Sequence, residues 1–257
     1  MHRIAVLAAL PWECKCVLPA LRKIRKGREE HCTWWCGRAT VGEVIVVRTG
    51  IGMERTAKAL PWLLQTFACD LLVSTGCAGG LMAVLSPGHV VVANEIVSAL
   101  SGASFSVPPP LVAALVEASQ QCGLKVATGR QLCVNEALAS VADKQHSALR
   151  FDAIAVDMES AAVAQAAMQH GLPFVIVRSV LDPLSDPLPS TDGLVDPQTG
   201  RVRPARLLSH VLSNGMLGLR GLQELYAWKQ CAEHALARLF AHWLSTKDWL
   251  PLSAPQN

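Results

Sequence analysis

Short apolar runs alternate with segments of helical period along most of the chain. The apolar runs predict buried strands, because strands covered on both faces read as continuous hydrophobic stretches. They occupy residues 4–10, 44–48, 71–74, 88–96, 132–134, 153–156 and 174–180. Between them, apolar residues at helical spacing predict helices over 12–24, 54–66 and 110–122. This order predicts an α/β fold, a three-layer α/β/α sandwich around a mainly parallel mixed sheet.

Prolines and glycines change this pattern after Asp182. They punctuate residues 183–204, which predicts a long loop next to Asp182. Apolar residues at helical spacing return over 205–244 and predict two or more helices, broken near Asn214-Gly215. We expect these helices to pack on the sheet or on a neighbouring subunit. The alternative is peripheral contact with a membrane surface through Leu217, Leu219, Leu222, Trp228 and Trp243.

The chain is long and apolar enough to bury one large core. It has 257 residues, of which 51% are hydrophobic. We therefore expect one domain over 1–204 and a C-terminal helical extension over 205–257, packed on the same domain. The formal net charge of +3 is small and scattered, which argues against nucleic acid and favours a small-molecule partner. No apolar run reaches the roughly 20 residues of a membrane-spanning helix.

The cysteines are odd in number, nine in all, and no signal peptide precedes the first apolar run. This usage predicts a reducing, cytoplasmic compartment. Cys14-x-Cys16 and Cys32-x-x-x-Cys36 are a candidate zinc site, but neither spacing is the usual knuckle and no His pair accompanies them. Ordinary buried cysteines are the better interpretation. We expect neither a metal nor a cofactor.

Acidic residues follow three of the predicted strands. Residues 155–162 (AVDMESAA) and 178–182 (RSVLD) read as strand, helix and strand, with carboxylates where parallel sheets bind ligands. Glu13 follows the first strand at the same edge, although a surface glutamate at a helix start would look the same.

Glycines also end two predicted strands, in Gly50-x-Gly52 and Gly76-x-x-Gly79-Gly80. Each alone predicts no more than a tight turn, and neither is a dinucleotide fingerprint or a P-loop. Together with three acids, however, the turns suit a sugar-cleaving site. One acid would donate a proton, one would bind hydroxyl groups and one would prepare a nucleophile.

These motifs resemble the nucleoside phosphorylase and nucleosidase superfamily, whose members include the purine nucleoside phosphorylases. Glu13, TGIG at 49–52, STGCAGG at 74–80, DMESAA at 157–162 and RSVLD at 178–182 occur in the family's order, and the resemblance covers residues 4–186. The first half is similar to methylthioadenosine/S-adenosylhomocysteine nucleosidases. The part from Asp182 through the helical tail is similar to hopanoid-associated phosphorylases, which act on adenosylhopane.

The resemblance implies a phosphorylase/hydrolase-like fold and cleavage of the N-glycosidic bond of an adenosyl nucleoside with release of adenine. A hopanoid-linked substrate is favoured, and a methylthioadenosine/S-adenosylhomocysteine nucleosidase is the alternative. The resemblance implies further that Asp182 protonates purine N7, that Glu159 binds the ribose hydroxyls and that Glu13 activates water. The other residues placed against the substrate are Met158, Asp157, Gly79, Cys77, Ala78, Leu138 and Ile51. Leu138 stands where nucleosidases stack an aromatic ring on adenine.

The attacking nucleophile stays open between water and phosphate. Many phosphorylases of the superfamily grip phosphate with an Arg and a Ser where this chain has Ser74 and Cys77. Arg48 and Arg130 are the candidate substitutes, and hydrolysis is favoured. A non-catalytic nucleoside-binding module is the alternative of another class, against which the three acids argue. The resemblance also implies a homo-oligomer, in which a neighbouring chain closes the site.

Overall fold

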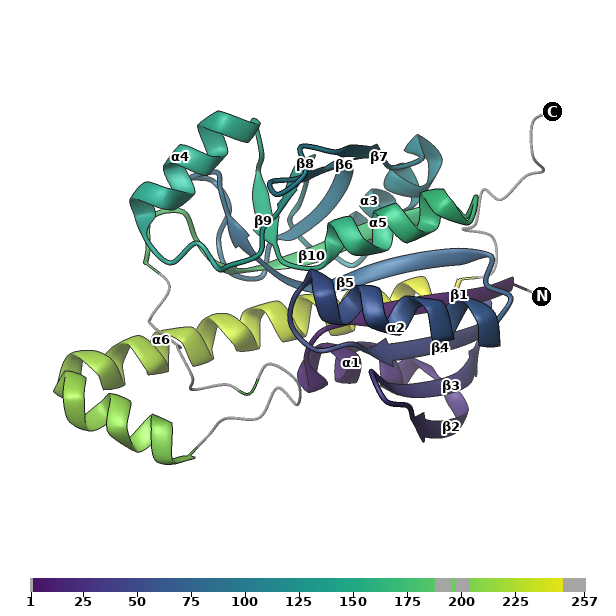
Figure 1. The fold of residues 1–257 in the computed structure, drawn as a ribbon, viewed down its shortest axis with the longest axis horizontal. Coiled ribbons are helices and arrows are strands. Elements are labelled where there is room, and N and C mark those ends of the chain that lie inside the picture. Colours follow the sequence, from purple (N-terminus) through teal and green to yellow (C-terminus); the bar gives the residue numbers. More distant parts are fainter. Residues whose placement is uncertain (1, 188–195, 197–203, 247–257) are drawn as a thin grey trace.

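The structure, a computed structural model, contains one mixed sheet of ten strands. It describes residues 2–187, 196 and 204–246, and for 204–220 the backbone alone. The sheet order is β10-β6-β8-β9-β5-β1-β4-β3-β2, with β7 on β6 (Figure 1). The strands are β1 His2–Ala8, β2 Arg22–Arg28, β3 Thr33–Ala39, β4 Gly42–Arg48, β5 Leu71–Gly80, β6 Val90–Ser98, β7 Ser104–Ser106, β8 Val126–Cys133, β9 Ala155–Asp157 and β10 Phe174–Asp182.

One half of the sheet closes on itself. Strand β10 pairs with β5 in parallel and with β6 in antiparallel orientation. The remaining pairs, β6 with β8, β8 with β9 and β9 with β5, complete a ring. The other half, from β1 through β4 and β3 to β2, stays open. This closure brings the ends of β5, β9 and β10 close to the end of β1.

Helices cover both faces of the sheet, which gives the predicted α/β/α layers (Figure 1). Helices α2 and α5 pack on each other and on one face, whereas α1, α3 and α6 contact one another or the strands on the opposite face. The helices are α1 Pro11–Val17, α2 Met53–Thr66, α3 Pro109–Gln121, α4 Val141–Phe151, α5 Ser160–Gln169 and α6 Pro204–Trp243.

The N-terminal region differs from the sequence prediction. The helix predicted over 12–24 is too long, because α1 ends at Val17 and a 3-10 turn, Leu18–Ala20, leads directly into β2. Pro19 lies in this turn and has no N–H to continue an α-helical ladder. Strands β2 and β3 were not predicted. The sequence of β2, RKIRKGR, is an exposed edge strand without the apolar run on which the prediction depended.

The C-terminal region forms one helix, α6, of 40 residues. The helix assignment continues across the predicted break near Asn214-Gly215, but the ribbon changes direction sharply within its first half (Figure 1). A single glycine inside a helix costs only about 1 kcal/mol, which does not end it. None of the helices in the described part is long and apolar enough to cross a membrane.

The C-terminal half of α6 belongs to the main core. Its inward-facing side chains are buried and contact α1, α3 and β10. Trp243, which the sequence offered for membrane contact, is only 1% exposed, so that role is wrong for it. The side chains of Leu217 and Leu219 lie outside the described residues, as does most of the proline-rich segment. The division at residue 204 stays a prediction.

Candidate active site

A cavity of about 200 Å³ lies where β1, β5, β9 and β10 end. Every residue that the sequence proposed for catalysis or for binding the nucleoside lines it. The wall consists of Ala9, Leu10, Glu13, Ile51, Cys77, Ala78, Gly79, Val134, Ala137, Leu138, Val156, Asp157, Met158, Glu159, Leu181 and Asp182. Chain segments far apart in the sequence thus meet at one site, because the ring of strands brings their ends together.

Glu13 is held by backbone N–H groups. Its Oε2 accepts hydrogen bonds from the N–H groups of Ala9 and Leu10 at 2.9 and 2.8 Å. Its Oε1 accepts one from the N–H of Cys77 at 2.9 Å. The side chain is buried, and burial raises the pKa of the Glu13 carboxyl, while these hydrogen bonds oppose the rise. Glu13 therefore links α1 to β5 in one fixed orientation.

The glycine segment after residue 75 continues β5 rather than ending it. Gly76 has φ of +144°, and a Cβ there would lie 2.5 Å from Glu13 Oε1 and 2.7 Å from an Arg178 guanidinium nitrogen. A Cβ at Gly79 would lie 3.3 Å from Asp182 Oδ2. Glycine is needed at 76 because two charged side chains occupy the space that any larger residue would fill.

A buried ion pair joins β9 to β10. Arg178 donates from Nε to Asp157 Oδ2 at 2.7 Å and from a terminal nitrogen to Ser74 Oγ at 2.9 Å. The other Asp157 oxygen, Oδ1, accepts from the N–H and the hydroxyl of Ser160 at 3.2 and 2.7 Å. Burial would lower the pKa of Arg178, but the neighbouring carboxylates raise it overall. Asp157 is thus occupied by protein partners on both oxygens, and it supports the wall of the cavity.

Glu159 lies at the start of α5 and reaches across to the TGIG turn. Its Oε1 accepts a hydrogen bond from the N–H of Gly52 at 2.8 Å, and its Oε2 lies 3.8 Å from Arg178. Burial raises the pKa of Glu159 to about 7, against the opposing pull of Arg178. Glu159 therefore changes protonation state near neutral pH, unlike an exposed glutamate.

Asp182 ends β10 and pairs with a lysine that the sequence analysis missed. Its Oδ2 lies 2.5 Å from Lys144 Nζ on α4, and Lys144 has no exposed side-chain surface. Burial raises the pKa of Asp182, and Lys144 opposes this rise. A lysine within an amphipathic helix looks solvent-facing in sequence. The only local signal was its place one turn into a helix, four residues after the N-cap Ser140.

The candidate phosphate ligands lie elsewhere. Arg48 donates to Thr33 Oγ1 at 3.1 Å and lines a separate surface pocket. Arg130 pairs with Glu95 at 2.8 Å. Neither arginine lines the cavity. The described residues of the cavity wall include no lysine and no arginine. Phosphate would meet a wall that carries four carboxyl groups, from Glu13, Asp157, Glu159 and Asp182.

The cysteines give no support to the zinc alternative. Cys14, Cys16, Cys32 and Cys36 are buried free thiols, and burial raises the pKa of Cys16 to about 12 and that of Cys32 to about 11. Thiolate is the form that binds zinc. Within the described ranges, no group of three or more His, Cys, Asp or Glu residues is arranged to hold a metal ion.

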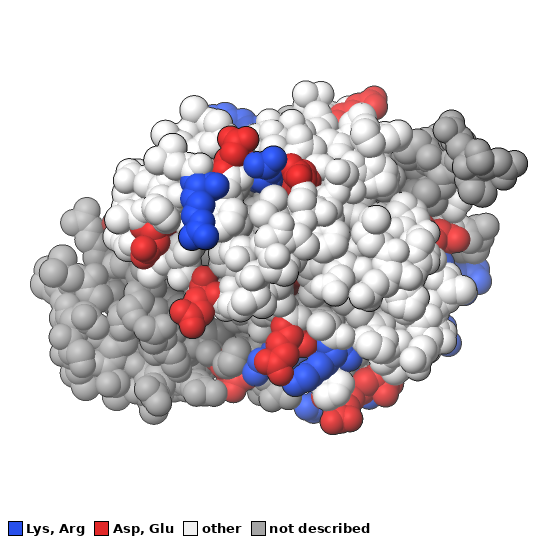
Figure 2. Space-filling model, turned by 45° about the horizontal axis from the view of Figure 1, so that its top comes forward, with Lys and Arg blue, Asp and Glu red and all other residues white. Residues whose placement is uncertain are grey.

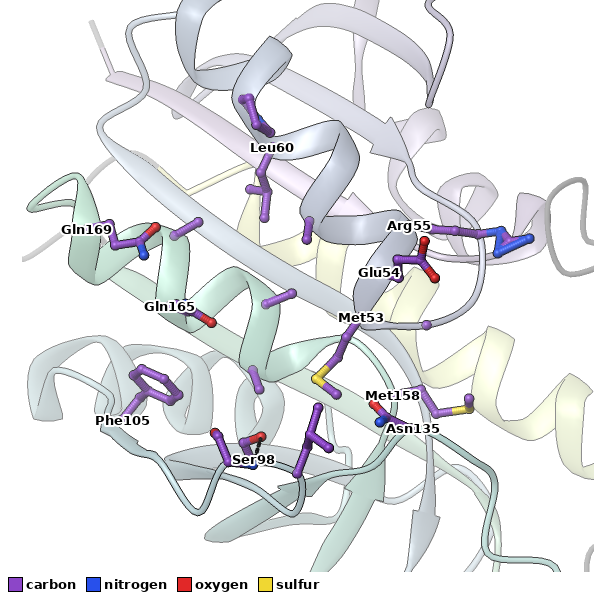
Figure 3. Close-up of a pocket in the computed structure, with 18 of the residues that line it drawn as sticks. Met53, Glu54, Arg55, Leu60, Ser98, Phe105, Asn135, Met158, Gln165 and Gln169 are labelled. Atoms are coloured by element: carbon purple, nitrogen blue, oxygen red, sulfur yellow. Dashed lines mark hydrogen bonds between the residues drawn. The ribbon is translucent and has the colours of Figure 1, made fainter.

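An apolar trough adjoins the cavity. It has a volume of about 830 Å³ and runs between α2 and α5. It shares Ile51 and Met158 with the cavity, and none of the described residues that line it belongs to α6. Figure 3 shows Met53 of α2 and Phe105 of β7 on its walls, with Gln165 and Gln169 along α5. The sequence analysis had no signal for this trough, because its two walls come from helices about 100 residues apart in the chain.

The comparisons with known proteins agree with this fold. The family model described as Phosphorylase superfamily matches residues 3–213. This chain belongs to the phosphorylase superfamily. It is 29% identical over 196 residues to a 5'-methylthioadenosine/S-adenosylhomocysteine nucleosidase of Anoxybacillus flavithermus, which covers 70% of this chain and 84% of the relative.

Two solved structures of the superfamily share the architecture. A 5'-methylthioadenosine/S-adenosylhomocysteine nucleosidase of Neisseria meningitidis, in complex with methylthio-immucillin-A, superposes with a TM-score of 0.74 at 21% identity, over 95% of this chain and 98% of that one. An S-adenosylhomocysteine nucleosidase of Streptococcus pyogenes, in complex with 5-methylthiotubericidin, gives 0.66 at 26% identity, over 70% and 84%. At 21% identity, the first of these likenesses shows a shared fold.

Proposed function

We propose that this member of the phosphorylase superfamily is an enzyme that hydrolyses the N-glycosidic bond of an adenosyl nucleoside and releases adenine. The observation that carries the proposal is the meeting of Glu13, Glu159 and Asp182 on the wall of one cavity. The names of the relatives, which are methylthioadenosine/S-adenosylhomocysteine nucleosidases, support the same reaction class. A pure binding module would have little use for three buried carboxyl groups, each of which costs desolvation energy.

The chemistry of the bond assigns each carboxyl group a task. Cleavage builds positive charge on the ribose and negative charge on the departing purine, so the site must stabilise both. Asp182, whose pKa burial raises, would protonate or hydrogen-bond purine N7. Glu159 would accept hydrogen bonds from the ribose hydroxyls, and its negative charge favours the oxocarbenium-like ring. Met158 and Leu138 would cover the ribose and the base with apolar surface.

Water is the better nucleophile for this cavity. Glu13 would orient or deprotonate the water, since its carboxyl group is fixed by three backbone donors and lines the cavity. A phosphate dianion would need cationic ligands to offset its charge. The described wall offers none, and Arg178 is occupied by Asp157 and Ser74.

The 5′ substituent is the finer part of the proposal. We propose an adenosyl compound linked to a large apolar group, such as a hopanoid, because the trough beyond Ile51 and Met158 has room for one. The trough runs along α2 and α5, and none of its described lining residues belongs to α6, so the apolar group would lie along α2 and α5. Methylthioadenosine or S-adenosylhomocysteine is the second candidate, supported by the names of the relatives.

The proposed assembly and location follow from the same features. A homo-oligomer would cover the trough with a neighbouring chain, and a cytoplasmic enzyme with peripheral contact at the inner membrane surface would suit a lipid-linked substrate. On the face in Figure 2, acidic and basic side chains of the described residues are interspersed, which is no pattern for nucleic acid. Light scattering of the purified protein measures the assembly directly.

Adenine release tests the whole proposal. The purified protein is incubated with methylthioadenosine, with S-adenosylhomocysteine and with adenosines that carry 5′-alkylthio chains of increasing length, each with and without phosphate. We expect free adenine and free ribose derivative, independent of phosphate, and a kcat/KM that rises with chain length. Formation of a ribose 1-phosphate would contradict hydrolysis, and rapid cleavage confined to methylthioadenosine would contradict the lipid-linked substrate.

A further inference from the structure

Lys144 is a buried cation with a complete set of acceptors. Its Nζ lies 2.5 Å from Asp182 Oδ2 and donates to the carbonyl oxygens of Pro183 and Asp186 at 2.8 Å each. An ammonium group has three N–H donors, so each donor here has an acceptor. Asp182 lines the cavity, whereas Lys144 does not. The lysine therefore stands behind the carboxyl group, on the side away from the ligand space.

We propose that Lys144 is a positioning residue that orients Asp182 toward the leaving base, an inference that rests on the proposed hydrolysis. The ammonium group holds Oδ2, and among the described side chains no hydrogen bond reaches Oδ1, while Asp182 itself lines the cavity. By binding the carbonyl groups of Pro183 and Asp186, it also fastens the chain that leaves β10 to α4. The carboxyl group is thereby held against rotation and against movement of its own backbone.

The same lysine joins the two segments that border the base side of the cavity. Helix α4 begins after Ser140, whose Oγ accepts the N–H of Asp143 at 3.0 Å. Leu138, two residues before this cap, lines the cavity. Lys144 therefore connects the segment of Leu138 with the segment of Asp182. A lysine spans this distance with an apolar stem, and its charge offsets that of a carboxylate inside the protein.

The charge of Lys144 also sets how easily Asp182 holds a proton. Lys144 opposes the rise that burial causes in the pKa of Asp182. Removal of this positive charge leaves burial unopposed and raises that pKa further. If protonated Asp182 is the acid, the activity lost at high pH in the natural protein would then persist to higher pH. The other titratable groups around Asp182 are Cys77 of β5 and, on the same cavity wall, Glu13, Asp157 and Glu159.

The first experiment compares Lys144→Met with Lys58→Met, a matched change at an exposed lysine that pairs with Glu54 on α2. We expect Lys144→Met to lower kcat for adenine release about 100-fold, the scale of a misplaced general acid, with a smaller change in KM. We also expect the basic limb of its kcat profile to move to higher pH. Lys58→Met should alter neither. An unmoved limb, whatever the fall in kcat, would mean a merely structural lysine and would overturn the proposal.

A second variant covers the case in which Lys144→Met does not fold. The double variant Lys144→Met/Asp182→Asn removes both charges, so it should recover the melting temperature that the single variant loses. Its kcat should match that of Asp182→Asn alone, because the lysine acts through Asp182. The pairing would be contradicted if the double variant were no more stable than Lys144→Met and its kcat were 10-fold or more below that of Asp182→Asn.

A measurement without substrate separates this inference from the proposed function. The ¹³C shift of the Asp182 carboxyl carbon, assigned by its loss in Asp182→Asn, is titrated in the natural protein and in Lys144→Met. We expect the midpoint to rise in the variant, and an unchanged midpoint would overturn the inference. If the natural protein releases no adenine from any adenosyl compound, the proposed function fails, while this titration still decides whether Lys144 controls Asp182.

Discussion

Glu13 Oε1 accepts a hydrogen bond from the backbone N–H of Cys77 at 2.9 Å, across 64 residues of sequence. With the N–H groups of Ala9 and Leu10 on the other oxygen, this contact holds the carboxylate in one orientation at the cavity wall. Three donors aimed at one carboxylate favour its ionised form against the effect of burial. That is the state in which Glu13 would accept a proton from water in the proposed reaction.

Replacement of Glu13 by Gln should abolish most of the activity. The amide nitrogen of Gln cannot accept a proton or a backbone N–H bond, so we expect kcat for adenine release to fall about 100-fold or more. Adenine is measured by chromatography after incubation with methylthioadenosine or a 5′-alkylthio analogue. Glu117→Gln, at an exposed residue of α3 that accepts a hydrogen bond from Gln121, is the control. Activity within a few-fold of the natural protein would remove Glu13 from the mechanism.

Asp182→Asn tests the proposed acid on the base. Asn keeps the shape of Asp182 but has no proton to give, so kcat should fall roughly 100-fold while KM changes little. Asp152→Asn makes the same change at an exposed residue with φ of +48°, a conformation that Asn tolerates. It should leave the rate unchanged. An Asp182→Asn protein that releases adenine at the natural rate would show that N7 needs no help from this residue.

The ionisation of Glu159 should appear in the pH profile. Its pKa is raised by burial to about 7, and the proposed contact with ribose needs the carboxylate, so kcat/KM should rise with pH through about 7. In Glu159→Gln the rate should be low, and this rise should be missing. Stopped assays between pH 5 and 9 measure both proteins. A Glu159→Gln profile that keeps the same rise would assign it to another group.

Glu159 should also affect folding stability in a defined direction. Between its ordinary pKa of 4.5 and the folded value of about 7, the folded protein holds a proton that the unfolded chain has lost. The free energy of unfolding should therefore decrease as pH rises through this window. Burial raises the pKa of Glu13 and Asp182 as well, so these groups add a pH dependence of their own. The test is therefore the difference in the free energy of unfolding between the natural protein and Glu159→Gln, measured by urea denaturation at each pH. That difference should shrink or vanish below pH 4.5.

Gly76→Ala should damage both stability and activity. The new Cβ would lie 2.5 Å from Glu13 Oε1, and the φ of +144° is unfavourable for alanine. We expect a loss of about 2 kcal/mol or more in the free energy of unfolding. Gly102→Ala is matched, since φ is +71° and nothing lies within 4 Å of its Cβ. It reports the backbone strain alone. Equal losses in the two variants would exclude the clash with Glu13.

Much of the site was predictable because its residues carry local signals. Glu13, Glu159 and Asp182 each follow an apolar run, and the ends of neighbouring parallel strands lie at one edge of a sheet. Lys144 gave no such signal. Its partners are 38 and more residues away in sequence, and a lysine is normally exposed. Its burial depends on a packing of α4 against the end of β10 that periodicity does not encode.

The hairpin of β2 and β3 was missed for a related reason. Arg22–Arg28 has no apolar run, since an edge strand needs burial on neither face and is often charged. Its pairing with β3 comes from backbone hydrogen bonds, which leave no mark on side-chain pattern. The sequence predicted α6 as helical, and its helix assignment continues across Asn214-Gly215 because one glycine costs a helix little.

The sequence by itself determined the α/β alternation, the superfamily motifs and the acids at the strand ends, because these depend on residue type and on spacing within one element. Only the tertiary structure decided that the sheet closes through β10, that Arg178 occupies Asp157, and that Lys144 stands behind Asp182. Each of these joins segments that are far apart along the chain. Such contacts are selected by the packing of the whole core, and no local pattern specifies them.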